Sequence, residues 1–463
     1  MEQVLAYLSS GQPRFVEELK AFLRIPSVST HPHHREDVKR CAEFLAAELR
    51  RIGMKRVDCV PTNGHPIVYA EWLEAPGKPT VLLYGHYDVQ PAEPFELWET
   101  PPFEPTVRGD NLFARGATDD KGQVWLHVKA LEAHLAKTGR LPVNVKLLIE
   151  GEEEVSSRHL DGYIDDHISE LKADVVVISD TGMYDYEQPS ICYGLRGLAY
   201  MEIRIEGPNK DLHSGGFGGS VANPLNTLSG IIAQLIDTDG RITVPGFYDD
   251  VVPLSDQERR AFATLPFNEE AYGERLGVGE LMGEKGYSTL ERIWARPTLD
   301  VNGLLGGFTG EGSKTVLPSK GMAKVSMRLV PNQDPARIAF AFEAYIKRLA
   351  PPTVKVEVIR HGTGKPILTP TNHPAVRAAA NAMEKAFGKT PVYTREGGTI
   401  PVVATFKEKL GLPTVLMGFG LPDCDAHAPN EKFNLKNYER GIVSAAWFYK
   451  ELENWVTERK QGD

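Results

Sequence analysis

Side chains that can bind a metal ion or carry a proton gather after four short apolar runs of this sequence. The runs span residues 81–84, 143–149, 174–178 and 413–418. The side chains that follow them are, in the same order, His86 with Asp88, three consecutive glutamates at 152–154, Asp180 and, after a short loop, His427. Unbroken apolar runs of this length are typical of strands buried on both faces of a sheet. Because an open α/β sheet binds its ligands outside the carboxyl ends of its strands, we expect these clusters to meet in one crevice.

Asp119 can join these clusters, because it lies in a glycine-flanked loop, 115–122, that leads into a predicted helix. Two histidines and several carboxylates form a mixed nitrogen and oxygen site, which suits zinc or manganese and offers too few oxygen ligands to favour calcium. Each cluster alone has a simpler interpretation, since consecutive glutamates usually form a solvated face and Asp180 could cap a helix. Their joint placement at strand ends is what favours a metal site.

A helix and a sheet must hold these residues in place. Apolar residues recur at helical spacing within 121–138 and form one face, namely Val124, Val128, Leu131 and Leu135. A strand, a helix and a strand in this order indicate a largely parallel sheet. The pattern typical of a parallel sheet with helices returns after residue 364, with a predicted helix at 374–387.

The segment between residues 194 and 364 has a different pattern, because apolar and polar residues alternate along it, as in 201–206. Predicted helices at 224–235 and 335–349 fall among its strands, and the order β-α-β-β-α-β is that of a ferredoxin-like domain. Residues 237–297 lack a clear period and are interpreted as an elaboration of this domain. We therefore predict an α/β protein with a catalytic domain built on a mostly parallel sheet, residues 1–193 and 364–463, interrupted by an α+β domain, residues 194–363.

Four motifs give the chain a resemblance to a known family. They are Gly-His-Tyr-Asp-Val-Gln-Pro at 85–91, Gly-Ala-Thr-Asp-Asp-Lys-Gly at 116–122, Lys-Asp-Leu-His-Ser-Gly at 210–215 and Arg-Glu-Gly-Gly-Thr-Ile-Pro at 395–401. On these motifs, and over nearly its whole length, the chain resembles the cytosolic nonspecific dipeptidase and carnosinase group within the aminoacylase and carboxypeptidase-G clan of zinc peptidases. The resemblance implies that the inserted domain serves as a lid and a dimerisation domain.

The resemblance also implies which residues hold the metal. Two zinc ions would be bound in each subunit, with manganese as an alternative. Asp119 would bridge them, His86 and Asp180 would complete one site, and Glu154 and His427 would complete the other.

The catalytic groups follow from the same resemblance. Glu153 would be the general base, which takes a proton from water and later delivers it to the leaving amine. Asp88 would orient His86, and the peptide bond after Asp119 would be cis. His213 would come from the inserted domain of the partner subunit and stabilise the oxyanion, so the active enzyme would be a homodimer.

Contacts to a small peptide substrate are implied for residues of both domains. Arg328 would bind the terminal carboxylate, which suits its fork of donors, and the further contacts would be Thr315, His361, Glu396, Gly398 and Thr399. The chain departs from the family after Asp180, where Thr181 and Gly182 replace the Asn-Tyr pair of the dipeptidases. The preferred dipeptide therefore stays open.

Composition argues against several other classes of protein. The net charge is -10 and no basic run is present, which argues against nucleic-acid binding. No apolar stretch reaches the roughly 20 residues that span a bilayer, and the start of the sequence lacks a basic-then-apolar leader. Four scattered cysteines, Cys41, Cys59, Cys192 and Cys424, form no recognisable metal or disulfide pattern. We expect a cytoplasmic enzyme with no membrane partner.

A di-zinc metallopeptidase that hydrolyses dipeptides is the function we favour, and two alternatives stay open. An amidohydrolase that acts on N-acyl amino acids could use the same metal centre and retain Arg328. A catalytically silent peptide-binding scaffold could share the fold, although it would not need a base beside its ligands.

Overall fold

The computed structural model describes residues 1–398 and 400–455 of the chain. Within this part the chain divides into two compact units. The first unit consists of Met1–Tyr193, Thr369–Thr394 and the residues from Thr405 onward, and the second consists of Gly194–Leu368 and Arg395–Ala404. Residues 395–404, which the sequence analysis placed in the catalytic domain, thus group with the second unit.

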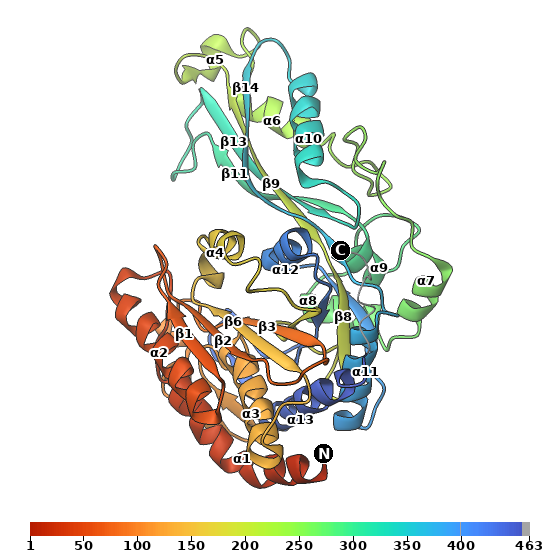
Figure 1. Ribbon diagram of the computed structural model, residues 1–463. Coiled ribbons are helices and arrows are strands. Elements are labelled where there is room, and N and C mark those ends of the chain that lie inside the picture. Colours follow the sequence, from red (N-terminus) through yellow and green to blue (C-terminus); the bar gives the residue numbers. More distant parts are fainter. Residues whose placement is uncertain (399, 456–463) are drawn as a thin grey trace. The chain divides into compact units, whose positions relative to one another are not determined.

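The first unit is built on a mixed sheet whose four central strands run parallel (Figure 1). In order across the sheet they are β6 (Asn144–Glu150), β3 (Thr80–His86), β7 (Val175–Ile178) and β17 (Thr414–Leu416). The antiparallel strands β2 (Ile67–Trp72) and β1 (Arg56–Val60) continue the sheet beside β6, and β8 (Ser190–Leu195) lies beside β17. Apart from the first residues of β3 and β6, the four central strands are wholly buried, as their unbroken apolar runs predicted.

Helices of the first unit pack with this sheet in one core: α1 (Glu2–Leu23), α2 (Arg35–Ile52), α3 (Lys121–Thr138), α11 (Pro374–Phe387) and α13 (Leu435–Leu452). The predicted bounds of α3 are confirmed, and Gly139 ends it in the left-handed conformation. The sequence pattern indicated a single apolar face, but residues Lys121–His134 are all buried, because α3 lies against α1, α2 and α13 (Figure 1). Its charged residues must therefore find partners inside the protein.

The second unit contains a four-stranded antiparallel sheet with the order β11-β13-β9-β14. The strands are β9 (Gly197–Glu206), β11 (Thr298–Gly306), β13 (Lys320–Leu329) and β14 (Lys355–Gly364). The helices α6 (Pro224–Ile232) and α10 (Pro335–Leu349) pack on one face of this sheet, where alternate residues of β13 are buried. The predicted order of strands and helices is confirmed, although α6 ends at Ile232 rather than at 235.

Three short helices occupy the stretch for which the sequence showed no clear period: α7 (Asp256–Ala263), α8 (Glu269–Leu276) and α9 (Thr289–Ala295). Two of them begin at capping boxes, in which Ser255 pairs with Glu258 and Ser288 pairs with Glu291. Short helices with local caps need little apolar periodicity, which explains why the pattern missed them. In the described part of the chain, no helix combines the length and the hydropathy needed to cross a membrane.

Candidate metal centre

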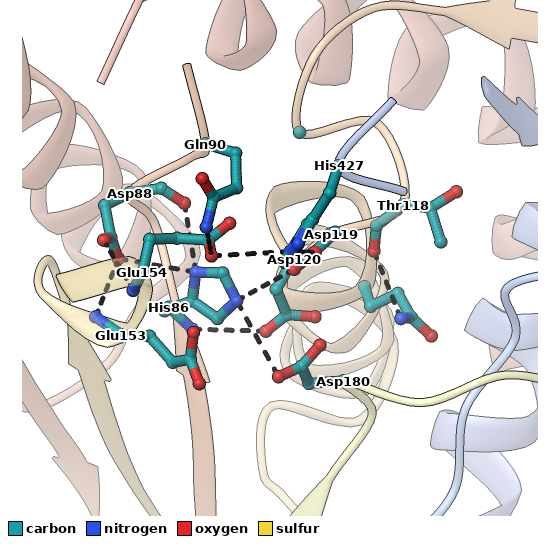
Figure 2. A network of polar contacts seen from close by, with 12 residues as sticks. His86, Asp88, Gln90, Thr118, Asp119, Asp120, Glu153, Glu154, Asp180 and His427 are labelled. Atoms are coloured by element: carbon teal, nitrogen blue, oxygen red, sulfur yellow. Dashed lines mark hydrogen bonds and ion pairs between the residues drawn. The ribbon is translucent and has the colours of Figure 1, made fainter. Parts of the chain in front are cut away.

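The carboxyl ends of the central strands meet at one edge of the first unit's sheet. His86 is the last residue of β3 and pairs with Glu150 at the end of β6, while Tyr84 pairs with Ile178 at the end of β7. A 3-10 turn, Glu153–Val155, follows β6, and Asp180 follows β7. Figure 2 shows the side chains of this region pointing toward one another, with those that follow the strands beside Asp119 and His427.

Asp119 lies between two histidines, with a different oxygen toward each. Its Oδ1 is 3.1 Å from Nε2 of His86, and its Oδ2 is 2.8 Å from Nε2 of His427. Asp180 Oδ2 is 3.8 Å from the same atom of His86, and Glu154 Oε2 is 3.4 Å from that of His427. These residues form two triads that share Asp119, and within each triad the candidate ligand atoms lie within 4.8 Å of one another.

This donor set fits two divalent cations. Ligand atoms around a tetrahedral zinc ion, with bonds of about 2.0–2.2 Å, are roughly 3.4 Å apart, close to the distances between the side chains of each triad. Three protein ligands with a further open position are the pattern of catalytic zinc sites. Among the described residues, the charged partners of Asp119, Asp180 and Glu154 are the two histidines, so the centre carries an excess of negative charge.

The pKa values of the side chains in this cluster reflect its excess of negative charge. Burial and the neighbouring charge of Asp119 raise the pKa of Glu154 to about 8 and raise the pKa of Asp180 well above its usual value. Burial lowers the pKa of His86, but its hydrogen bonds to Asp119 and Asp88 outweigh burial and raise the pKa well above its ordinary value. The hydrogen bond to Asp119 likewise raises the pKa of His427 to about 8. Without a cation the cluster retains protons, which a bound metal would displace.

His86 is held by Asp88 on the side away from Asp119. Its Nδ1 is 3.0 Å from the backbone carbonyl oxygen of Asp88 and 3.4 Å from the carboxylate, so an Nδ1–H can donate there and Nε2 remains for a metal. The Asp88 carboxylate also accepts hydrogen bonds from the backbone N–H groups of Glu153 and Glu154, at 3.3 and 3.1 Å. Asp88 therefore contacts the loop of the expected base as well as the histidine that it was expected to orient.

Glu153 is a member of neither triad, although it lies beside them (Figure 2). Burial raises the pKa of its carboxyl group above the usual value. A carboxylate that lies near the metal ligands without being one, and whose proton affinity is raised, suits proton transfer near neutral pH. Gln90, which the sequence analysis gave no role although it lies within the motif 85–91, donates from Nε2 to Glu154 Oε2 at 2.6 Å.

The loop that carries Asp119 requires its glycines. Gly116 has a φ of +82°, and a Cβ on Gly122 would lie 1.8 Å from the carbonyl oxygen of Ala117. The peptide bond between Asp119 and Asp120 is cis, as the resemblance implied.

The remaining predicted site residues belong to the second unit. His213 is exposed at the end of β10 (Leu212–His213), and its Nδ1 accepts a hydrogen bond from the N–H of Gly215 at 2.9 Å. Thr315 is also exposed, and its carbonyl oxygen accepts the N–H of Ser214 at 3.0 Å. The structure thus brings His213 and Thr315 together within this unit.

Arg328 lies on β13, opposite Leu198 of β9, and close to a second arginine that the sequence analysis did not single out. Burial, and after it the neighbouring charge of Arg328, lower the pKa of Arg196 to about 10. Arg196 also contacts the motif at 395–401. Its backbone N–H donates to the carbonyl oxygen of Glu396 at 3.1 Å, and its side-chain Nε donates to the carbonyl oxygen of Gly397 at 3.3 Å. Two neighbouring guanidinium groups favour the binding of a carboxylate.

The last three predicted substrate contacts have varied surroundings. His361 Nε2 lies 2.9 Å from Glu202 Oε2, so this histidine has a carboxylate partner inside the second unit. Gly398 is exposed, and Thr399 lies outside the described residues.

Comparison with known proteins identifies the family. The sequence profile of peptidase family M20/M25/M40 matches residues 82–450. The Cys-Gly metallodipeptidase DUG1 of Candida albicans is 37% identical over 455 residues, which cover 93% of each chain. The Beta-Ala-His dipeptidase of Homo sapiens is 33% identical over 476 residues, covering 98% of this chain and 92% of that protein. A solved structure, that of the M20 family metallo-carboxypeptidase Sso-CP2 from Sulfolobus solfataricus, has 35% sequence identity and a TM-score of 0.84 and covers 95% of this chain and 99% of that one. The family resemblance and the fold class drawn from the sequence are thereby confirmed, and this chain belongs to peptidase family M20/M25/M40.

Proposed function

We propose that this chain is a dipeptidase that uses two divalent metal ions, zinc or manganese. His86, Asp119 and Asp180 would hold one ion, and Asp119, Glu154 and His427 the other. The observation that carries this proposal is the position of Asp119, whose two carboxylate oxygens face two different histidines at 3.1 and 2.8 Å. That arrangement suits a ligand shared between two ions.

Metal ions bound there would polarise the scissile carbonyl group and lower the pKa of the attacking water towards about 7. Glu153 takes the proton from that water as the new C–O bond forms, and returns it to the nitrogen as the C–N bond breaks. Its position outside both triads supports this role, since a ligand could not carry the proton.

We propose that the second unit supplies substrate contacts and the dimer interface. Because Nδ1 of His213 accepts a hydrogen bond from Gly215, its proton is on Nε2, which suits donation to a developing oxyanion in the other subunit of a homodimer. Arg328, with Arg196 beside it, suits the substrate carboxylate. Thr315, His361, Glu396, Gly398 and Thr399 remain proposed contacts on the strength of the family resemblance. We also propose a cytoplasmic location, in line with the scattered cysteines of the sequence.

The substrate class rests on the relatives. Those from Candida albicans and Homo sapiens are named for cleaving Cys-Gly and Beta-Ala-His, which supports dipeptides as substrates here. Sso-CP2 is a metallo-carboxypeptidase of similar identity, which favours removal of a carboxyl-terminal residue from longer peptides as a second candidate. Both functions need a group such as Arg328 to bind the substrate's terminal carboxylate.

A substrate panel tests the proposal. Purified protein loaded with Zn²⁺ or Mn²⁺ is given Cys-Gly, β-Ala-His, tripeptides, amino-blocked dipeptides and N-acetyl amino acids. We expect cleavage of the free dipeptides and little cleavage of the rest. Efficient cleavage of tripeptides and blocked dipeptides would establish the carboxypeptidase instead, and cleavage confined to N-acetyl amino acids would establish the amidohydrolase.

Glu153→Gln supplies the mechanistic control. We expect kcat to fall by about 10²- to 10⁴-fold, with the metal content unchanged. The matched variant is Glu152→Gln, because Glu152 is adjacent but pairs with His159 Nδ1 at 2.7 Å, and its kcat should stay within a few-fold of the unmodified enzyme. Bound metal with no turnover of any substrate in the unmodified protein would favour the silent scaffold.

A further inference from the structure

Glu431 is a fully buried carboxylate that follows His427 closely in the sequence and has no role in the function proposed so far. It accepts four hydrogen bonds, two on each oxygen. Oε1 accepts the backbone N–H groups of Thr118 and Asp119, at 2.9 and 3.0 Å. Oε2 accepts the N–H of Gly116 and Nη1–H of Arg115, both at 2.9 Å. Three of these donors belong to the backbone of the loop that presents Asp119.

A carboxylate suits this position because all four of its contacts are donors. An amide offers one acceptor oxygen and a donor nitrogen, so a glutamine in either orientation would place N–H groups against N–H groups. Burial raises the pKa of Glu431, while the Arg115 guanidinium and the backbone donors act against burial. All four hydrogen bonds can be accepted only when the Glu431 carboxyl group is ionised.

Arg115 extends these contacts to a third segment. Its side chain is nearly as buried as that of Glu431, with 1% of its surface exposed. Nη2 donates to the carbonyl oxygen of Pro91 at 3.2 Å, and the guanidinium lies 5.4 Å from the centre of the Trp98 ring. Pro91 ends the motif that begins beside His86. The pair of Arg115 and Glu431 therefore joins the segments that carry His86, Asp119 and His427.

The loop of His427 needs such support, because its backbone is in an unfavourable conformation. Asp425, His427 and Asn430 have φ values of 54°, 63° and 67°, in the left-handed region. Asn430 anchors one end of the loop, accepting the N–H of Glu99 and donating to the carbonyl oxygen of Leu97, both at 2.8 Å. Glu431 is the next residue, and it fixes this end of the loop to the loop of Asp119.

We propose that Glu431 is a positioning residue that sets the separation between Asp119 and His427 and thereby the affinity of the second triad for its metal. The inference rests on the proposed metal-dependent function, and it assigns to a non-ligand carboxylate a large share of the metal affinity. Groups that orient metal ligands typically contribute 10- to 100-fold to the affinity.

The test is metal binding by Glu431→Gln, measured apart from activity. Zn²⁺ is titrated calorimetrically into the metal-free protein, and Co²⁺ is added as a spectroscopic probe of ligand geometry. We expect one of the two Zn²⁺ affinities to fall by about 10- to 100-fold, the Co²⁺ absorption bands to shift, and excess Zn²⁺ to restore much of kcat.

Glu132→Gln is the matched control, because Glu132 is another buried carboxylate that accepts charged donors and lies in a cluster of helix residues. It should lower the thermal midpoint and leave both Zn²⁺ affinities unchanged. If Glu431→Gln does not fold, the same titration is carried out on Arg115→Lys, which keeps the positive charge but loses the fork of donors. We expect a smaller loss of Zn²⁺ affinity in this variant. Unchanged Zn²⁺ affinity in the folded variant, or an equal loss in Glu132→Gln, would overturn the inference. An unmodified protein that binds no Zn²⁺ would instead overturn the proposed function.

Discussion

Two clusters of acidic side chains in the first unit differ in their charge balance. The metal centre contains Asp119, Asp180 and Glu154. The helix cluster contains Glu18, Glu48 and Glu132, from α1, α2 and α3, whose oxygens lie within 4.8 Å of one another, as the ligand atoms do within each separate triad of the candidate metal centre. Proximity of acidic oxygens alone would make both groups candidate metal sites.

Positive side chains distinguish them. Lys129, which is fully buried, lies 2.6 Å from Glu18 and 3.0 Å from Glu132, and it also pairs with Glu48. Arg14 and Arg51 pair with the same carboxylates at 2.6 to 2.9 Å. Three positive charges thus balance three negative ones in the helix cluster. In the candidate metal centre, the charged partners of the three carboxylates among the described residues are the two histidines, so the positive charges do not balance the negative ones.

Proton affinities differ in the same sense. Burial raises the pKa of Glu132, but Lys129 and Arg14 outweigh it and lower the pKa to about 2. Burial and Asp119 raise the pKa of Glu154 to about 8. Burial likewise raises the pKa of Asp180, whereas at Asp119 the hydrogen bonds from His427 and His86 outweigh burial and lower the pKa. Burial thus dominates at Glu154 and Asp180, and charged partners dominate at Glu132 and Asp119.

Removal of metal should produce the largest effect, and only at the metal centre. Treatment with 1,10-phenanthroline should reduce dipeptide hydrolysis to background, and Zn²⁺ or Mn²⁺ should restore it. Metal at about 1,000 times its Kd would stabilise the fold by about 4 kcal/mol, so the thermal midpoint should also fall on removal. Full activity after verified loss of metal would remove the proposed distinction between the two clusters.

Lys129→Met should have the next largest effect, on stability and not on metal binding. The variant leaves the buried Glu132 and the partly buried Glu18 and Glu48 with the two arginines. Loss of one member of a buried ion pair costs about 3–5 kcal/mol. Urea unfolding measures the loss, and elemental analysis should find an unchanged metal content. The control is Lys347→Met, whose lysine is half-exposed and pairs with Glu343, and which should change stability by less than about 1 kcal/mol. A lower metal content in Lys129→Met would contradict the separation of the clusters.

Acid should weaken the helix cluster within a defined pH window. The ordinary pKa of Glu132 is 4.5 and its folded value is about 2, so between these values the unfolded chain binds more protons. The contribution of Glu132 to the free energy of unfolding is complete above pH 4.5 and is lost as the pH falls through about 2. Urea unfolding of the metal-free protein on either side of the window should show this loss, and Glu132→Gln should make it smaller. An identical pH dependence in that variant would refute the assignment.

Arg51→Ala should produce the smallest effect. The Arg51 side chain is 48% exposed, and Lys129 and Arg14 remain to balance Glu132. Exposed ion pairs contribute about 0–1 kcal/mol, so the unfolding free energy should change by no more than that. A loss equal to that of Lys129→Met would show that the number of charges, and not their burial, decides the stability of the cluster.

Much of the fold could be predicted because its features are local in the sequence. Central parallel strands leave unbroken apolar runs, and the bounds of α3, α10 and α11 are confirmed. The last two helices begin with a proline that follows a capping residue, Asp334 or His373, and α3 and α11 end at Gly139 and Gly388. The clusters of the candidate metal centre were visible because they follow strands or precede a helix, with His427 separated from its strand by a loop.

The missed features depend on distant contacts. Glu431 meets the loop of Asp119 across more than 300 residues of sequence, and no local pattern marks it. Arg196, which lies between β8 and β9, gains significance from Arg328 on β13, more than 100 residues later in the sequence. The helices α7 and α9 were also not predicted, but for them a local signal was present, since their capping boxes at Ser255 and Ser288 can be read in the sequence.

The two triads are completed at very different times during synthesis of the chain. His86, Asp119 and Asp180 all precede the segment 194–368, whereas His427 follows it. Translation proceeds from the amino terminus, so the first triad exists as a set of residues before the second unit has been made. The second triad has no histidine until the segment that follows residue 368 has been made. In the function proposed above, a nascent chain that has not yet reached His427 could therefore offer one complete ligand set at most, and both sets would exist only once His427 has been added.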